Sequence, residues 1–529
     1  MSVQFESLPE RILRKQWSFF WAGLIFGVAQ IIYMVSLWVG AWGHNKPAIS
    51  TPITVTTDLG NMFRGMELAL VQLFGIADTQ LYGMSTDGVA SGGAFIPGIG
   101  WPIVGMMIGG FLVARFERES REWVKYSTRM LWLSFIGGIL FSYGTRLAGG
   151  CTLNHLLGGL PMMSIHSTVS VLGMALGGAV AFLIMSRARL AGNFKHQETR
   201  SYVCSADAGE AALYDPNYRP RRRPIYWVSL AFVVIFFGVA IWGGLFNPEA
   251  LQHLKKGQMV AFAKSIDASG WLFVTGTLLA GVIGGFAMAK SGFGTECAIV
   301  AAETAQSMTR NDSLYARMGV PRITRTLMRG YLPMIGVAAS WVVMLAFLWG
   351  AWTFFGIKPG FEGGLKEQLT AGSLIGGVLL GAGAVLLIGC EIRSYMRIGL
   401  GYLNTWVGFM GFAVGYLPFT LFYEEHIAFQ KATLVTETYK WYQLAFPNSI
   451  AAQQMMLFAW LVLIAVGLVY LIRLGVRNTG VSRSALLHKS TEELQVNIDD
   501  LAAQGGGRIG IVTAPMPVPM LIKPAPAAS

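Results

Sequence analysis

Residues 144–152 read Gly144-Thr145-Arg146-Leu147-Ala148-Gly149-Gly150-Cys151-Thr152, and they end an apolar run where a membrane helix would be expected to continue. A second run, residues 381–390, reads Gly381-Ala382-Gly383-Ala384-Val385-Leu386-Leu387-Ile388-Gly389-Cys390 and ends in the same way. Each run stops at a small residue followed by a cysteine. Because glycine lets the backbone leave helical geometry at little steric cost, both sites are predicted to be breaks in membrane helices.

The composition around these breaks is that of a membrane protein. Of 529 residues, 53% are hydrophobic and only 13% are charged, with 65 glycines. Uncharged apolar runs long enough to cross about 30 Å of hydrocarbon recur along the chain. They cover 17–43, 94–114, 167–186, 225–244, 268–289, 330–357, 368–390, 398–422 and 448–472, and a shorter tenth, 130–145, stops at Arg146. The sequence predicts an all-α polytopic protein in a lipid bilayer, with about ten transmembrane helices, some of them broken.

The net charge of +12 does not indicate a nucleic-acid partner, because Arg and Lys collect in a few loops between the apolar runs. This is the positive-inside pattern. Loop 187–224 is the most basic, and both termini also carry basic residues. The N-terminus has no small-residue cleavage site of the secretory type. We therefore expect a multi-pass protein of the bacterial inner (plasma) membrane with both termini cytoplasmic.

Two segments suggest an internal repeat. Ala22-Gly23-Leu24-Ile25-Phe26-Gly27 resembles Ala280-Gly281-Val282-Ile283-Gly284-Gly285, as Gly150-Cys151 resembles Gly389-Cys390. The extra run at 225–244 would invert the second half, a recurring plan among transporters. Chance likeness of two glycine-rich segments is the alternative. The predicted organisation is a first membrane repeat (1–190), a basic cytoplasmic loop (191–224), a second repeat with extra helices (225–475) and a partly disordered cytoplasmic tail (476–529).

Three of the four cysteines lie beside glycine-rich breaks: Cys151, Cys390, and Cys297 after Lys290-Ser291-Gly292-Phe293-Gly294-Thr295-Glu296. A broken helix exposes backbone N–H groups that can receive an anion. A thiol adds a weak donor and a polarizable sulfur surface. A single such cysteine is more often a buried small hydrophobe, but three at three breaks predict a route for a small sulfur-containing anion. Gly149, Gly150, Gly389 and Arg146 complete the predicted site.

Other polar residues near the breaks keep two interpretations each. Arg146 either neutralises an anion or snorkels and pairs with a carboxylate. Arg393 and Arg397 share a helical face and either attract substrate or mark the cytoplasmic interface. His155 is a proton relay or makes a structural hydrogen bond. Cys204, in a polar loop, is most simply a solvent-exposed thiol.

The cysteine pattern excludes some sites. Four cysteines in a chain of this length are not a disulfide framework. The sequence has no CxxC pair and no Cys/His metal spacing, so neither a metal site nor a cofactor is expected.

With these motifs the sequence resembles the YeeE/YedE family of sulfur-transport membrane proteins. The likeness rests on residues 144–152, on 293–297 and on Gly389-Cys390, and extends over about 17–190 and 268–475. The resemblance implies inner-membrane uptake of thiosulfate, or of a related sulfur or selenium compound, with cysteines contacting the substrate in turn. It also implies delivery to cytoplasmic sulfur metabolism, with a TusA-like sulfur carrier as a partner. Gly389-Cys390-Glu391 departs from the Gly-Gly-Cys-Thr pattern of the first break.

The function predicted from the sequence is therefore a transporter or channel, not an enzyme, for a small sulfur-containing anion such as thiosulfate. One alternative is a membrane sulfurtransferase that forms a cysteine persulfide. Another is a membrane partner that anchors a soluble sulfur protein through loop 187–224 or the tail.

Overall fold

The structure is a computed structural model. It describes residues 16–43, 47–53, 55, 59, 62–63, 100–116, 128–187, 223–246, 268–291, 328–360, 365–387, 389–490 and 494. Predictions for Cys204, for Cys297 and for the end of the tail lie outside these residues.

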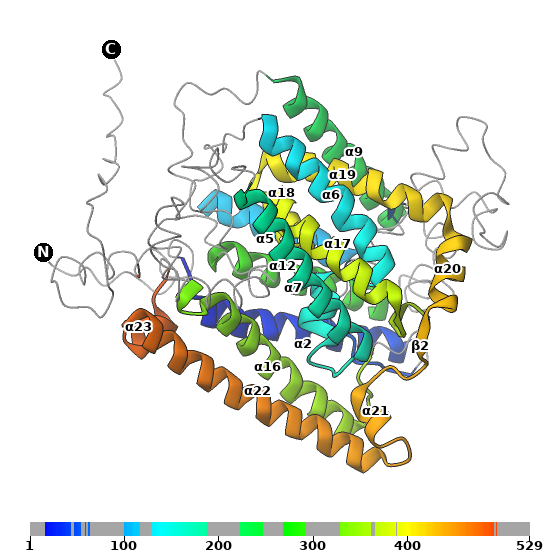
Figure 1. The fold of residues 1–529 in the computed structure, drawn as a ribbon, viewed down its shortest axis with the longest axis vertical. Helices are drawn as coiled ribbons and strands as arrows, with labels where there is room; N and C mark the ends of the chain where they lie inside the picture. Colours follow the sequence, from blue (N-terminus) through cyan, green and yellow to red (C-terminus); the bar gives the residue numbers. More distant parts are fainter. Residues whose placement is uncertain are drawn as a thin grey trace, which may run out of the picture.

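The described chain is almost entirely helical (Figure 1). The first half contains α2 (Phe19–Gly43), α5 (Trp101–Phe116), α6 (Thr128–Ala148), the π-helix η4 (Leu153–Gly159) and α7 (Ile165–Arg187). The second half contains α9 (Pro224–Phe246), α12 (Ala268–Ser291), α16 (Leu332–Phe355), α17 (Ala371–Leu387), α18 (Glu391–Leu400), α19 (Leu403–Leu421), α20 (Tyr423–Ala432), α21 (Trp441–Ala445), α22 (Ile450–Thr479) and α23 (Arg483–His488). The short elements are the 3-10 helix η8 (Leu365–Glu367) and two strands, β1 (Leu369–Thr370) and β2 (Leu434–Thr436).

The predicted all-α membrane fold is confirmed. Among the described residues, 6 helices are long and apolar enough to cross a membrane, or up to 7 if the bent pair α19–α20 is one span. Shorter apolar helices occur in α5 and α7. The predicted number of ten is not confirmed by length and composition. A helix that is interrupted at its middle, or one that carries arginines, does not easily meet both requirements.

The structure corrects three predicted helix limits. Helix α6 does not stop at Arg146 but continues to Ala148, because the arginine side chain lies over aromatic rings of α19. The predicted run 368–390 ends earlier, at Leu387, and is followed by the separate helix α18. Helix α18 ends at Gly401, whose φ of 94° is left-handed, and α19 begins at Leu403 rather than at 398.

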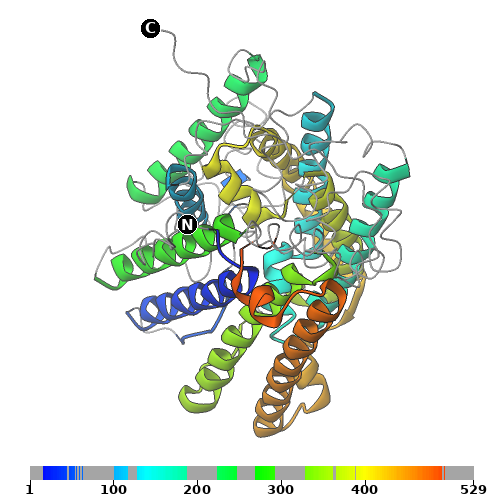
Figure 2. The same ribbon diagram turned by 90° about the vertical axis from the view of Figure 1, so that its left-hand side faces the viewer.

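The helices pack in two groups. In one, α5, α12, α2, α16 and α22 lie side by side in that order (Figure 2). In the other, α17 packs against both α6 and α7, and α6 also packs against α19. Helix α9 lies on α19, and the short helix α18 contacts α5, α12 and α19. The two cysteine-bearing breaks therefore lie inside the bundle.

The packing contacts occur in matched pairs along the chain. The contact of α5 with α12 has a counterpart in that of α16 with α2. Likewise, the contact of α7 with α17 has a counterpart in that of α19 with α6. These paired contacts appear when the series α2, α5, α6, η4, α7 is compared, in chain order, with the series α12, α16, α17, α18, α19.

Loops from both halves meet beside the bundle. Strands β1 and β2 pair antiparallel, and isolated bridges join Ser164 to Lys440 and Ser50 to Pro359. The Lys440 side chain is buried, and its Nζ donates to the Gly360 carbonyl at 2.6 Å. These contacts attach the turn before α7 to the segment before α21.

Close approach of α6 and α17 depends on glycine. A Cβ on Gly383 would lie 2.5 Å from the backbone nitrogen of Phe141, whereas one on Gly467 of α22 would meet nothing within 4 Å. We expect Gly383→Ala to destabilise the protein by about 1–3 kcal/mol through overpacking. The measurement is the thermal midpoint in detergent, with Gly467→Ala as the matched control. A midpoint for Gly383→Ala as high as that of the control would contradict this packing.

Candidate functional site

The first break follows the last turn of α6. Gly149 has a φ of 75°, a left-handed conformation that side chains disfavour, and its N–H donates to the Arg146 carbonyl at 3.4 Å. The chain then passes Cys151 and enters η4, where the His155 N–H donates to the Cys151 carbonyl at 3.0 Å. A π-helix is rare and is found most often at functional sites. The break is thus a tight turn that leads from one helical geometry into another.

The second break has a different local geometry. The Gly389 N–H donates to the Ala384 carbonyl at 3.0 Å, and Cys390 is extended, with φ −74° and ψ 173°, as the N-cap of α18. The N–H and hydroxyl of Ser394 donate to the Cys390 carbonyl at 2.8 and 2.9 Å. Cys390 therefore lies at the positive end of a buried helix dipole.

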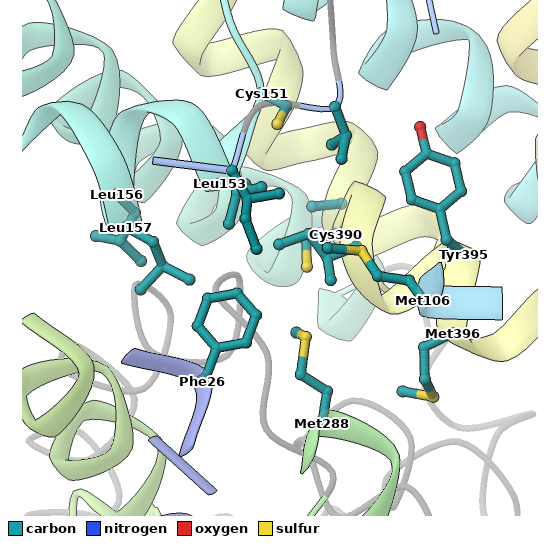
Figure 3. Packing of buried hydrophobic residues seen from close by; sticks show 14 of the residues in the cluster. Phe26, Met106, Cys151, Leu153, Leu156, Leu157, Met288, Cys390, Tyr395 and Met396 are labelled. Carbon is teal, nitrogen blue, oxygen red and sulfur yellow. The ribbon is translucent and has the colours of Figure 1, made fainter. Parts of the chain in front are cut away.

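Both thiols lie in the protein interior and belong to one cluster. Cys151 and Cys390 are each 0% exposed. Figure 3 shows them together with Leu153 and with the methionines Met106 and Met288. The Cys151 thiol donates to Asn154 Oδ1 at 3.9 Å, a long contact even for sulfur. Two cysteines 239 positions apart in the sequence are thus brought to one region, with neither facing lipid.

Polar groups from α18 and α19 border this cluster. The Tyr395 hydroxyl donates to Glu391 Oε1 at 2.5 Å, and Tyr416 lies 3.3 Å from the Thr145 hydroxyl, oxygen to oxygen. Cys151 and both tyrosines belong to the same buried cluster. The surroundings of Cys151 therefore combine a polarizable sulfur with hydroxyl groups.

Arg146 supplies positive charge next to the first break. Its guanidinium carbon lies 5.0 Å from the centre of the Tyr416 ring and 5.6 Å from that of Phe419. A cation over two aromatic faces is stabilised without leaving the protein. Arg146 is half-buried, next to the first break.

Arg393 and Arg397 were given two interpretations from the sequence, and their burial decides against one of them. They are 0% and 1% exposed, whereas a residue that marks a membrane interface would reach water. Lys290, at the end of α12, is also fully buried. Ionisable residues inside a membrane protein are costly and commonly functional, so these three cations are candidates for anion contact.

The three predicted glycines have unequal roles in the geometry. Gly149 needs its positive φ, and a Cβ on Gly150 would lie 3.0 Å from Asn154 Cβ and from His155 Nε2. A Cβ on Gly389 would meet nothing nearer than 3.7 Å. Gly389 is therefore not required by space or by backbone conformation, unlike the glycines of the first break.

Several neighbours of the thiols escaped sequence analysis. Tyr395 is four residues after Glu391 on one helix, a spacing that could have indicated their contact. Tyr416 is 271 residues from Thr145 in the sequence. The Trp341 indole N–H donates to the Leu156 carbonyl at 2.9 Å, and these two residues are 185 positions apart. No local pattern marks either of these contacts.

Within the described part of the chain, no group of three or more His, Cys, Asp or Glu residues is placed to hold a metal ion. The chemistry available at the site is that of buried thiols, hydroxyls and cations. These groups suit reversible contact with a polarizable anion.

A bundle of apolar helices, several of them long enough to cross a membrane, with two thiols buried in its interior defines a multi-pass α-helical membrane protein. Residues 2–180 match the model of a family described as sulphur transport. The match confirms the predicted resemblance and covers α2 to most of α7 with the first break. Comparison with curated proteins and with solved structures gave no match.

The break geometry predicts unequal effects of two alanine substitutions. Gly149→Ala should cost about 1–2 kcal/mol, because alanine disfavours the left-handed conformation. Gly389→Ala should be close to neutral. Thermal midpoints of the two purified variants in the same detergent test this difference, and equal midpoints would show that the first break does not need glycine.

Proposed function

We propose that the protein takes up a small sulfur-containing anion, thiosulfate in the first place, across the bacterial inner membrane. The observation that carries the proposal is the convergence of Cys151 and Cys390, from two helix breaks in opposite halves of the chain, in one buried cluster. The match of residues 2–180 to a sulphur-transport family supports the same class of substrate.

An inverted repeat accounts for this convergence. The matched packing contacts of the two helix series are those expected if a twofold axis relates them. By the positive-inside rule, the basic loops around 115–129, 187–223 and 310–329 favour opposite directions for the corresponding helices. Ten crossings with both termini in the cytoplasm follow if α6 with η4 and α17 with α18 each count as one crossing.

In the proposed mechanism the anion passes the thiols without forming a lasting bond. Transient S–H···S or S–H···O contacts replace part of its hydration, and the positive charge of Arg146 offsets its negative charge. The N-terminal amides of α18, next to Cys390, offer a second favourable position. Cys297 is proposed as a third contact. Related sulfur or selenium anions remain alternative substrates, and a TusA-like carrier is the proposed cytoplasmic acceptor.

Removal of a thiol should slow uptake. We expect Cys151→Ala and Cys390→Ala to lower the initial rate of radiolabelled thiosulfate uptake into proteoliposomes by about tenfold, which corresponds to about 1.4 kcal/mol in the barrier. The matched control is Cys204→Ala, in the basic loop. Uptake at the wild-type rate by both site variants, inserted at wild-type levels, would remove the thiols from the pathway.

The sulfurtransferase alternative predicts a covalent product. A transporter should give no stable mass increase on Cys151, Cys297 or Cys390 after exposure to thiosulfate, because sulfur is not transferred. Intact-protein mass spectrometry under non-reducing conditions measures this. An added mass of one sulfur atom on one of these residues would favour the enzyme and contradict the proposed passage.

A further inference from the structure

Two buried histidines lie in direct contact next to the first break. The ring centres of His155, in η4, and His166, in α7, are 4.9 Å apart with an interplanar angle of 72°. The residues are 0% and 2% exposed. Two imidazoles in contact can pass a proton between them.

Serine hydroxyls hold both rings. His155 Nδ1 lies 3.1 Å from Ser167 Oγ, and His166 Nδ1 lies 2.9 Å from Ser164 Oγ. The Ser167 N–H also donates to Ser164 Oγ, at 3.4 Å. The four residues therefore form one connected, buried polar group in the bundle. Hydroxyls that both donate and accept are suitable links in a proton path.

One end of this group lies at Cys151. His155 lies in the π-helical turn, four residues after the cysteine, and its backbone N–H donates to the Cys151 carbonyl. A Cβ on Gly150 would lie 3.0 Å from His155 Nε2, so this ring nitrogen lies against the backbone next to the thiol. An anion that passes Cys151 would thus lie close to the imidazole.

The other end lies at the loops that join the two halves. Ser164 forms a backbone bridge with Lys440, and the Ile165 N–H donates to the Tyr439 carbonyl at 3.0 Å. By loop charge these segments are on the outer side of the membrane. The polar group therefore extends from the outer loops to the first break.

Among the described residues, the elements packed most closely against the two rings carry few titratable groups. The elements in main contact with η4 and α7 are α16, α17 and β1, and the sequences of these three contain no titratable residue. The titratable groups at the two ends are the Cys151 thiol and the Lys440 ammonium. Burial opposes a charged imidazole, so a proton on this pair needs negative charge nearby. A dianion bound next to Cys151 would supply that negative charge.

The membrane potential favours uptake of the anion together with protons. An inside-negative membrane potential opposes import of a dianion in proportion to its charge, and each accompanying proton removes one unit of that opposition. We propose that His155 and His166 carry protons inward with the anion, so that the protein is a proton-coupled symporter. This inference rests on the proposed function. Protons enter from the outer loops through His166 and His155, accompany the anion past Cys151 and leave on the inner side.

The test measures proton and anion movement together. Wild-type protein is reconstituted in vesicles that contain a pH-sensitive dye, with the membrane potential held constant by potassium and valinomycin. Addition of thiosulfate should acidify the lumen by one to two protons per anion taken up. An inward proton gradient of one pH unit should raise the initial uptake rate several-fold. Both effects should be lost in the double variant His155→Gln/His166→Gln.

His426 provides a matched control. It is a largely buried histidine on α20, bonded to Tyr143 and to the Phe422 carbonyl, away from the pair. His426→Gln should retain acidification and its gradient response. If the double variant does not insert, the single variant His166→Asn, which keeps a hydrogen-bonding group near Ser164, is measured instead and should lower acidification per anion.

The possible outcomes separate the two proposals. Wild-type uptake without acidification, and without a response to the gradient, would overturn proton coupling and leave thiosulfate transport standing. Acidification that persists unchanged in the histidine variants would overturn the assignment to this pair. Absence of thiosulfate uptake by the wild type would overturn the proposed function and the coupling with it.

Discussion

The structure depends on the need to satisfy backbone polar groups wherever a membrane helix is interrupted. Lipid offers no hydrogen bonds, so a break is stable only where protein surrounds it. At the first break, Gly149 turns the chain, a π-helical turn takes up the following amides, and the Trp341 indole satisfies the Leu156 carbonyl. At the second, α18 begins at once after Cys390 and Ser394 caps the cysteine carbonyl. The cysteines lie in the protein interior because they are part of the breaks, which protein must surround.

Glycine makes this arrangement possible in a second way. Helices α6, α7 and α17 approach so closely that Cβ atoms on glycines such as Gly177, Gly381 and Gly383 would meet the backbone of a neighbour. Such small-residue contacts drive helix association in membranes, where apolar surface alone does not. Close packing of α17 between α6 and α7 brings two breaks from distant parts of the chain into one cluster.

The interior combines two kinds of groups that a sulfur-containing anion would use. Thiols offer polarizable contact with little cost of desolvation, and arginine and lysine side chains supply positive charge. The histidine pair adds groups that can change charge during a transport cycle.

Local sequence patterns determined the class of the protein. Apolar runs, basic loops and the small-residue–cysteine pairs predicted a polytopic helical fold, the positions of two breaks and the resemblance to a sulfur-transport family, because these features depend on residues close together in the chain. The tertiary structure alone decided that Arg393 and Arg397 are buried, that α18 is separate from α19, and that Tyr416 meets Thr145. It also decided that His155 meets His166. Such facts depend on which helices pack together, and periodicity within one helix carries no information about its neighbours.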